Sequence, residues 1–114
     1  MEVKGENYHI TYNPSAATVT FGGTLRLRGM AEYGSIIQLL DEVARQEPDT
    51  ITLDVRQLQF LNSSGINNLF RFVIKVRDQD RSKLIVRGSA QVAWQQKSLQ
   101  NLQRLMASVQ LELS

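Results

Sequence analysis

The sequence predicts an α/β fold: one domain over residues 1–114, built on a mixed, mostly parallel sheet of four to five strands with about three main helices. Two observations support this. Segments with strand-like apolar alternation are interleaved with segments of helical periodicity, in the order strand, strand, helix, strand, helix, strand, helix, strand. Strands that are separated by helices usually pair in parallel through right-handed crossovers. The chain is also 42% hydrophobic, which is enough for one core.

The first half of the chain is expected to hold the first strands and one helix. Residues 8–13 alternate and lead into a proline turn. Residues 18–21 and 24–27 flank Gly22-Gly23, which fits either a tight hairpin or one long strand with a glycine bulge. A helical stripe follows and ends before Pro48. Its apolar members are Tyr33, Ile36, Ile37, Leu40, Val43 and Ala44.

The centre of the chain predicts a buried strand, a short connection and a helix. Residues 51–55 alternate as a strand, and residues 56–61 form a connection whose apolar side chains reach the core. The side-chain oxygens of Asn62, Ser63 and Ser64 can accept hydrogen bonds from the first-turn N–H groups of the helix that follows. The turn therefore presents a serine hydroxyl at the positive end of a helix, and it is the best candidate site. The expected apolar stripe of this helix is Ile66, Leu69, Phe70 and Val73.

The last third of the chain is expected to add a strand, a helix and a final strand. Residues 84–86 form a continuous apolar run, typical of a strand covered on both faces. A helix follows with Val92, Leu99, Leu102 and Met106 on one side, and residues 109–113 alternate as the last strand. Trp94 lies away from that apolar side. It is expected to cover a sheet edge or to pack under a loop, or else to serve as an exposed anchor for a partner.

The residue inventory argues against an enzyme. The chain has no cysteine, and His9 is its only histidine, so a catalytic triad, a His–Cys pair or a histidine-rich zinc site cannot be assembled. Gly22-Gly23 lacks the surrounding motif of a phosphate-binding loop. We therefore expect no catalytic residues, no metal and no cofactor. The lack of cysteine, of a long apolar run and of an apolar leader predicts a cytoplasmic protein without membrane insertion.

Charge is distributed unevenly along the chain. Residues 1–54 carry 4 basic and 8 acidic side chains, whereas residues 55–114 carry 9 basic and 3 acidic ones. Such a dipolar protein is expected to be steered toward an acidic partner surface. The basic residues are scattered rather than gathered in an arginine-rich run, so nucleic acid is not the expected partner.

Around the candidate turn the sequence resembles the STAS domain family, which comprises the anti-sigma-factor antagonists and their relatives. The family pattern is an apolar strand, an Asp, a short apolar connection, and Asp-Ser-Ser-Gly-(Leu/Ile) opening a helix. It is matched here by Ile51-Thr-Leu-Asp54, Leu58-Gln-Phe60 and Asn62-Ser-Ser-Gly-Ile66. Two further segments, Gly23-Thr-Leu25 and Leu84-Ile-Val-Arg-Gly88, also resemble the family pattern. The order of strands and helices agrees with that of the family. The resemblance thus covers nearly the whole chain and implies a single STAS-like domain.

The sequence departs from the family pattern at two positions. Asn62 stands where the family has an acidic residue before the serine pair. Arg26 replaces an acidic residue that often follows Gly-x-Leu. Asn62 keeps a capping side chain but loses the negative charge.

The resemblance implies a regulatory module that binds a protein partner and is switched by phosphorylation of Ser63, with Ser64 as the less favoured acceptor. The implied partner is an anti-sigma factor or related serine kinase with a histidine-kinase-like ATPase fold, with a phosphatase to reverse the switch in transcription regulation. Alternatives are a non-switching adaptor subunit of a larger assembly or transporter system, and a small anion- or nucleotide-binding domain. The expected partner-binding residues are Asp54, Asn62, Ser63, Ser64, Gly65, Asn67, Asn68, Arg71 and Lys75, with Phe72 at the margin of their surface.

Overall fold

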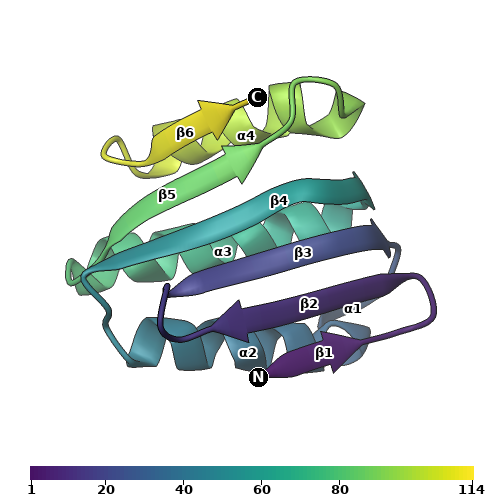
Figure 1. The fold of residues 1–114 in the computed structure, drawn as a ribbon, viewed down its shortest axis with the longest axis horizontal. Coiled ribbons are helices and arrows are strands. Elements are labelled where there is room, and N and C mark those ends of the chain that lie inside the picture. Colours follow the sequence, from purple (N-terminus) through teal and green to yellow (C-terminus); the bar gives the residue numbers. More distant parts are fainter.

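The computed structural model describes residues 1–114 as six strands and four helices (Figure 1). The predicted α/β class is confirmed, with one strand more than expected. The strands are β1 (Glu2–Lys4), β2 (Tyr8–Asn13), β3 (Thr18–Leu25), β4 (Thr50–Leu61), β5 (Lys83–Gly88) and β6 (Gln110–Leu113). The helices are α1 (Gly29–Glu32), α2 (Gly34–Arg45), α3 (Ser63–Gln79) and α4 (Ala93–Leu105).

All strands belong to one sheet, and their spatial order equals their order in the sequence. The pairs β1–β2 and β2–β3 are antiparallel, while β3, β4, β5 and β6 are parallel to one another. The sheet is therefore mixed and mostly parallel, as predicted. The unpredicted strand is β1, where Val3 lies opposite Ile10. Its three residues are too few to display a strand period in the sequence.

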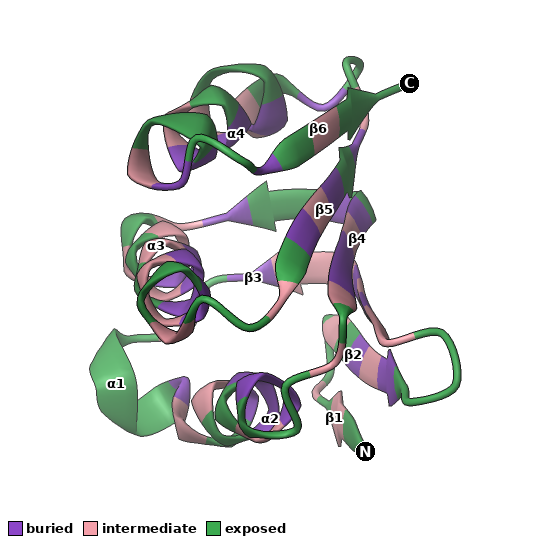
Figure 2. Cartoon of the chain, turned by 90° about the vertical axis from the view of Figure 1, so that its left-hand side faces the viewer, coloured by how far each residue is buried: buried purple, intermediate pink, exposed green.

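All four helices cover the same face of the sheet (Figures 1 and 2). The expectation that residues 84–86 are covered on both faces is therefore wrong: Leu84 and Val86 are buried, but Ile85 is only half-buried. The cause is the strand order. Successive right-handed crossovers that always advance in one direction place every helix on one side. The open face is polar, and Asp54 lies there between Thr20 and Arg87.

Gly22-Gly23 lies inside one continuous strand, which decides for the bulge over the hairpin. The pairing of β3 with β4 shifts register on both sides of this glycine pair. Gly23 has a φ of +91°, and a Cβ there would lie 2.9 Å from the Cα of Tyr8. The N–H of Thr24 donates to the carbonyl of Asn7 at 2.8 Å. Glycine thus lets β3 bend closely past the loop before β2.

Strand β4 extends through the segment expected as a connection. It continues to Leu61 because β3 remains beside it, as far as the pair Leu25 and Leu61. Leu58 and Leu61 point into the core under the helices, as expected. Phe60 was expected in the core as well, but that expectation is wrong, because its side chain is 38% exposed. The long strand carries the chain directly to the start of α3, which fixes the position of the serine turn.

Helix α3 lies between α2 and α4 and buries a different stripe from the one expected (Figure 2). Ile66 and Phe70 are only half-buried. Phe72 is 3% exposed, so its expected place at the margin of an exposed partner surface is wrong. Phe72 follows Gly65 by seven positions and Leu69 by three, and it therefore shares their inward side. The buried residues are Gly65, Leu69, Phe72, Val73 and Val76.

The first turn of α4 hydrogen-bonds to the last part of β4, beyond the point where β5 stops pairing with that strand. Gln95 is fully buried, and its Nε2 donates to the carbonyls of Val55 (2.6 Å) and Leu58 (3.0 Å). Its Oε1 accepts from the N–H of Ser89 at 2.7 Å. The indole N–H of Trp94 also donates to the Leu58 carbonyl, at 2.9 Å. Trp94 therefore covers the sheet, the first of its expected roles.

The four helices are also informative about membrane insertion. None of them has both the length and the apolar character that a membrane-spanning helix needs.

Candidate functional site

The candidate site is the turn from β4 into α3, at the carboxyl end of the parallel strands. Leu61 ends β4 and Ser63 begins α3, so Asn62 alone connects the two elements. Ligand sites in open α/β sheets lie at this end of the strands. The predicted site is therefore in a suitable part of the fold.

Asn62 is the N-cap of α3, and its side chain forms three hydrogen bonds. Its Oδ1 accepts from the N–H of Gly65 (3.0 Å) and from the hydroxyl of Tyr33 (2.7 Å). Its Nδ2 donates to the carbonyl of Leu27 at 2.7 Å. An aspartate could accept both bonds but has no donor for the Leu27 carbonyl. The structure thus gives a physical reason for asparagine at this position, where the STAS pattern has an acid.

Tyr33 ties the start of α2 to the same turn. The residue is 1% exposed, and its hydroxyl reaches Asn62 from inside the protein. Burial raises the pKa of the Tyr33 hydroxyl, so the group stays protonated and remains a donor to Asn62. The sequence pattern assigned Tyr33 only to an apolar stripe. A buried tyrosine hydroxyl usually finds a hydrogen-bond partner, which is the one signal in the sequence for this contact.

Gly65 is buried at the point where α3, β4 and α2 meet. A Cβ at this position would lie 2.6 Å from the Tyr33 hydroxyl oxygen and 2.9 Å from Cγ of Leu61. Both distances are too short for any side chain. Glycine is therefore needed here for the close packing of the helix start, and Gly65 is not available to touch a partner.

Ser63 and Ser64 are the first two residues of α3. Asn62 performs the capping, so the serine hydroxyls are not needed for that task. Ser63 is exposed, and Ser64 is half-buried beside it. The free N–H groups and the dipole at the start of a helix favour negative charge there.

A shallow hollow of about 230 Å³ lies beside the turn, between α1 and α3. Arg71 is the only charged residue in its wall, and the Nη1 of Arg71 lies 3.1 Å from the Sδ of Met30. The structure thus gathers several predicted partner-binding residues on one surface next to Ser63. The residues that line the hollow are Gly29, Met30, Ser64, Asn67, Asn68 and Arg71.

Besides the buried Gly65, three predicted partner-binding residues lie outside this surface. Asp54 is in β4 on the open face of the sheet, where its carboxylate binds Arg56 with distances of 2.8 and 3.0 Å. That hydrogen-bonded ion pair lowers the pKa of Asp54. Lys75 lies farther along α3 and pairs with Asp41 of α2 at 3.1 Å. Phe72, as described above, is in the core.

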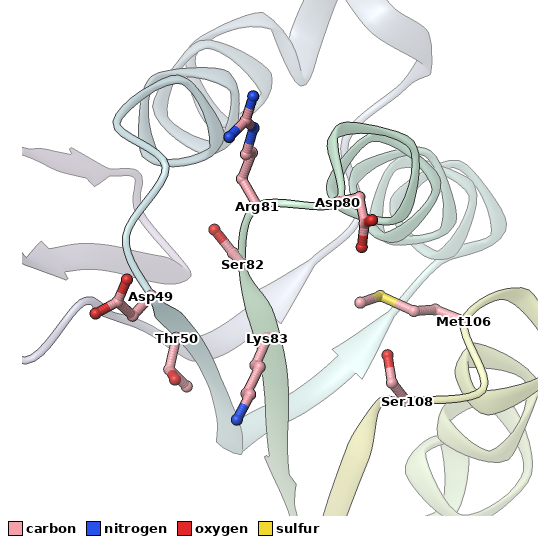
Figure 3. Close-up of a pocket in the computed structure, with 8 residues that line it drawn as sticks. All are labelled: Asp49, Thr50, Asp80, Arg81, Ser82, Lys83, Met106 and Ser108. Carbon is pink, nitrogen blue, oxygen red and sulfur yellow. The ribbon is translucent and has the colours of Figure 1, made fainter.

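A larger depression of about 510 Å³ lies at the opposite end of the sheet (Figure 3). It is formed where β4 and β5 begin and where α3 and α4 end. The side chains of Arg81 and Lys83 point away from one another there. Charged groups do not converge on a common point, so we assign no site to it. Its lining residues are Asp49, Thr50, Asp80, Arg81, Ser82, Lys83, Met106 and Ser108.

Solved structures with the same architecture include two of SiaC. SiaC of Pseudomonas aeruginosa superposes with a TM-score of 0.74 at 15% identity, over 100% of this chain and 96% of SiaC. The structure of the P. aeruginosa diguanylate cyclase SiaD in complex with its activator SiaC matches with a TM-score of 0.73 at 12% identity, over 100% and 99% of the two chains. An anti-sigma factor antagonist from Mycobacterium paratuberculosis matches with 0.62 at 15% identity, over 98% and 82%.

The chain has a STAS-like fold. At these identities the likeness establishes the fold, and no protein-family model or curated protein matches the sequence.

Within the STAS-like fold, two residues near the turn were not predicted as part of the site. Arg26 was noted only as a departure from the family pattern, and Met30 lies in α1, which the sequence did not reveal. A helix of four residues is too short to show a period. Met30 lines the hollow beside the turn, whereas Arg26 stacks on the Phe60 ring of β4, and both placements depend on tertiary contacts.

Proposed function

We propose that this protein is a regulatory module that binds a protein partner around Ser63, and that phosphorylation of Ser63 releases the partner. The supporting observation is the exposed hydroxyl at the first position of α3, next to a cap that Asn62 completes without it. Such a hydroxyl is accessible to a kinase. Its modification leaves the hydrogen bonds of the turn in place.

The expected effect of a phosphate follows from its charge. Phosphorylation adds about −1.5 to −2 charges and three acceptor oxygens. Within the module, the N-terminal end of α3 tolerates this charge. At a contact with a partner, the same group is costly when it is buried without a cation. The switch therefore acts on binding rather than on folding.

The proposed partner is an anti-sigma factor or a related serine kinase with a histidine-kinase-like ATPase fold, acting in transcription regulation in the cytoplasm. The STAS-like fold supports this class, since it is shared with an anti-sigma factor antagonist. An enzyme that the module regulates, in the way that SiaC activates SiaD, is the second class. We propose no catalytic activity. The proposed contact residues are Ser63, Ser64, Asn67, Asn68 and Arg71.

The test is affinity purification from the native cell, with phosphosite mass spectrometry on the recovered protein. The affinity of the purified partner is then measured for wild type and for the variants Ser63→Ala and Ser63→Asp. We expect Ser63→Ala to bind as wild type and Ser63→Asp to bind at least tenfold more weakly. Ser35→Asp is the matched control, because Ser35 is an exposed serine in the first turn of α2.

Two outcomes contradict the proposal. A stable partner that binds Ser63→Asp as tightly as wild type, without phosphate on Ser63 under any condition, identifies a non-switching adaptor instead. Recovery of the protein with no specific partner, at native expression level and after cross-linking, contradicts the binding module itself.

A further inference from the structure

We propose that Met30 is a site of reversible oxidation by peroxide, and that its sulfoxide form hydrogen-bonds to Arg71 and fastens α1 to α3. This modification is separate from the phosphorylation of Ser63. The oxidation and the new hydrogen bond do not depend on the proposed function. The effect on a partner, given below, rests on it.

Met30 is open to a small oxidant. The chain has three methionines. Met30 is 56% exposed and Met1 is 53% exposed, whereas Met106 is 8% exposed. Met30 also lines the hollow of about 230 Å³ beside the serine turn. A peroxide molecule can therefore reach Met30 from solvent, and oxidation of methionine to its sulfoxide follows from such access.

The contact with Arg71 distinguishes Met30 from the other exposed methionine. The Nη1 of Arg71 lies 3.1 Å from the Sδ of Met30, and no other methionine sulfur has a hydrogen-bond donor beside it. Arg71 takes part in none of the six ion pairs of the chain, so no carboxylate competes for its guanidinium group. A thioether is only a weak acceptor. The donor is thus in place, but the present bond is weak.

Helix α1 is held loosely, so a stronger bond at Met30 has something to change. Every residue of α1 is exposed (Figure 2). The N–H groups of Glu32 and Tyr33 donate to the preceding turn at 3.4 and 3.3 Å, both longer than the usual range of about 2.7–3.2 Å. The contact between Met30 and Arg71 is the only side-chain hydrogen bond from α1 to another helix.

The oxidation step requires only hydrogen peroxide. A lone pair of the Met30 sulfur attacks one peroxide oxygen, so that an S–O bond forms while the O–O bond breaks. The proton on the transferred oxygen passes to the departing oxygen, which leaves as water. The sulfur loses two electrons and the peroxide gains them. A methionine sulfoxide reductase restores the thioether.

The product has the acceptor that the thioether lacks. The sulfoxide oxygen carries partial negative charge and is attached to a sulfur that already lies against Arg71. A hydrogen bond from a charged donor is roughly twice as strong as one between neutral groups. Oxidation should therefore order α1 against α3. Because Arg71 is one of the proposed contact residues, its engagement by Met30 should also weaken the binding of a partner.

The experiment compares the full chain before and after treatment with hydrogen peroxide. Peptide mass spectrometry follows the oxidation of each methionine, and hydrogen–deuterium exchange follows the backbone amides of Glu32 and Tyr33. We expect Met30 to be oxidised faster than Met106. Exchange of the two amides should then slow by about three- to tenfold, the range that one hydrogen bond supplies.

Three variants assign the effect to the proposed pair. Met30→Leu has a side chain of similar size that cannot be oxidised, and Arg71→Ala removes the donor. Neither should show slower exchange after the same treatment, although Met1 and Met106 are oxidised in both. Arg104→Ala, which changes an exposed arginine of α4, should retain the slowing. Methionine sulfoxide reductase should return oxidised wild type to its original exchange rates.

Three results overturn the inference. A Met30 that stays reduced while Met106 is oxidised contradicts the accessible site. Unchanged or faster exchange of the α1 amides in protein oxidised at Met30 contradicts the new hydrogen bond. Slowing of the same size in Arg71→Ala shows that Arg71 is not the donor.

Partner binding separates this inference from the phosphoswitch. We expect oxidised wild type to bind the purified partner more weakly than identically treated Met30→Leu. Slower exchange in α1, together with a partner that ignores Ser63→Asp, supports the oxidation site and contradicts the phosphoswitch. A partner that is lost by Ser63→Asp but binds oxidised wild type normally supports the phosphoswitch and contradicts the effect of oxidation on binding.

Discussion

The hydroxyl of Tyr33 donates a hydrogen bond of 2.7 Å to Oδ1 of Asn62, and this contact joins the start of α2 to the cap of α3. The same asparagine donates from Nδ2 to the carbonyl of Leu27, so its amide serves as acceptor and donor at once. This arrangement holds the serine turn rigid and leaves Ser63 at the surface. It also makes position 62 sensitive to the exchange of an amide for an acid.

Asn62→Asp should destabilise the protein at neutral pH. The carboxylate would face the Leu27 carbonyl, which then has no donor, and the cost is on the order of 1–3 kcal/mol. At pH values low enough to protonate the new acid, its hydroxyl can donate to Leu27 and part of the loss is recovered. Urea unfolding at pH 7 and pH 3 measures the difference in free energy of unfolding between each variant and wild type at the same pH. Asn67→Asp, an exposed asparagine on the same helix, should change stability by less than about 0.5 kcal/mol. An Asn62→Asp variant as stable as wild type at pH 7 contradicts the assigned amide geometry.

Gly65→Ala should lower the melting temperature because its methyl group meets the Tyr33 hydroxyl and Leu61. Forced overpacking of this kind costs about 1–3 kcal/mol. The control is Gly34→Ala, where no atom lies within 4 Å of the added Cβ. That variant should be neutral or more stable by about 0.4–1 kcal/mol, since it restricts the unfolded chain. Equal melting temperatures of the two variants would refute the close packing at Gly65.

Gln95→Ala should be among the most damaging single changes in α4. It removes both donors to the Val55 and Leu58 carbonyls and the acceptor for the Ser89 N–H. The Leu58 carbonyl keeps the indole N–H of Trp94 as a donor, so two groups lose their partner, the Val55 carbonyl and the Ser89 N–H. Each such group costs about 1–3 kcal/mol, so a loss of at least about 2 kcal/mol is expected in urea unfolding. Gln96→Ala changes an exposed glutamine next to it and should have little effect. If water replaces the amide without loss, the two variants will unfold at similar urea concentrations.

Asp54→Asn should show a pH-dependent effect on stability. The hydrogen-bonded partner Arg56 lowers the pKa of Asp54 in the folded protein, so the folded state favours the charged carboxylate. The contribution of this ion pair to the free energy of unfolding is fully present above the pKa that Asp54 has in the unfolded chain. It is lost as the pH falls through the lower pKa that Asp54 has in the folded protein. Arg56 is half exposed, which limits the contribution at pH 7 to roughly 1 kcal/mol. The difference in free energy of unfolding between wild type and Asp54→Asn should therefore disappear by pH 2. Asp49→Asn, which changes an exposed residue, should differ little from wild type at pH 7 or at pH 2. A gap that persists unchanged at pH 2 rules out the ion pair as its source.

Much of the site was predictable because it depends on local chemistry. Asn62 is a strong N-cap residue beside a sheet strand, and that placed the start of α3 to within a residue. The helical repeat then set Asn67 and Arg71 on one side of α3, because residues four apart are neighbours on a helix. The exposed position of Ser63 follows from the same two facts.

Other features depended on distant partners and escaped the sequence. The sequence predicts Phe72 at the surface because the apolar stripe that it shows starts at Ile66. The buried stripe starts at Gly65, whose small size hides its inward position. The two faces of β5 look equally apolar in the sequence, yet the direction of the crossovers left one of them open.

The sequence by itself determined the alternation of strands and helices, the cap at Asn62 and the family resemblance at the serine turn, because periodicity and capping act over a few residues. Only the tertiary structure decided three contacts: the hydrogen bond from Tyr33 to Asn62, the hydrogen bond from Gln95 to the Val55 carbonyl of β4, and the stacking of Arg26 on Phe60. These contacts join residues 29 to 40 positions apart. They arise only after bulges and sheet register bring two segments together, which no local pattern records.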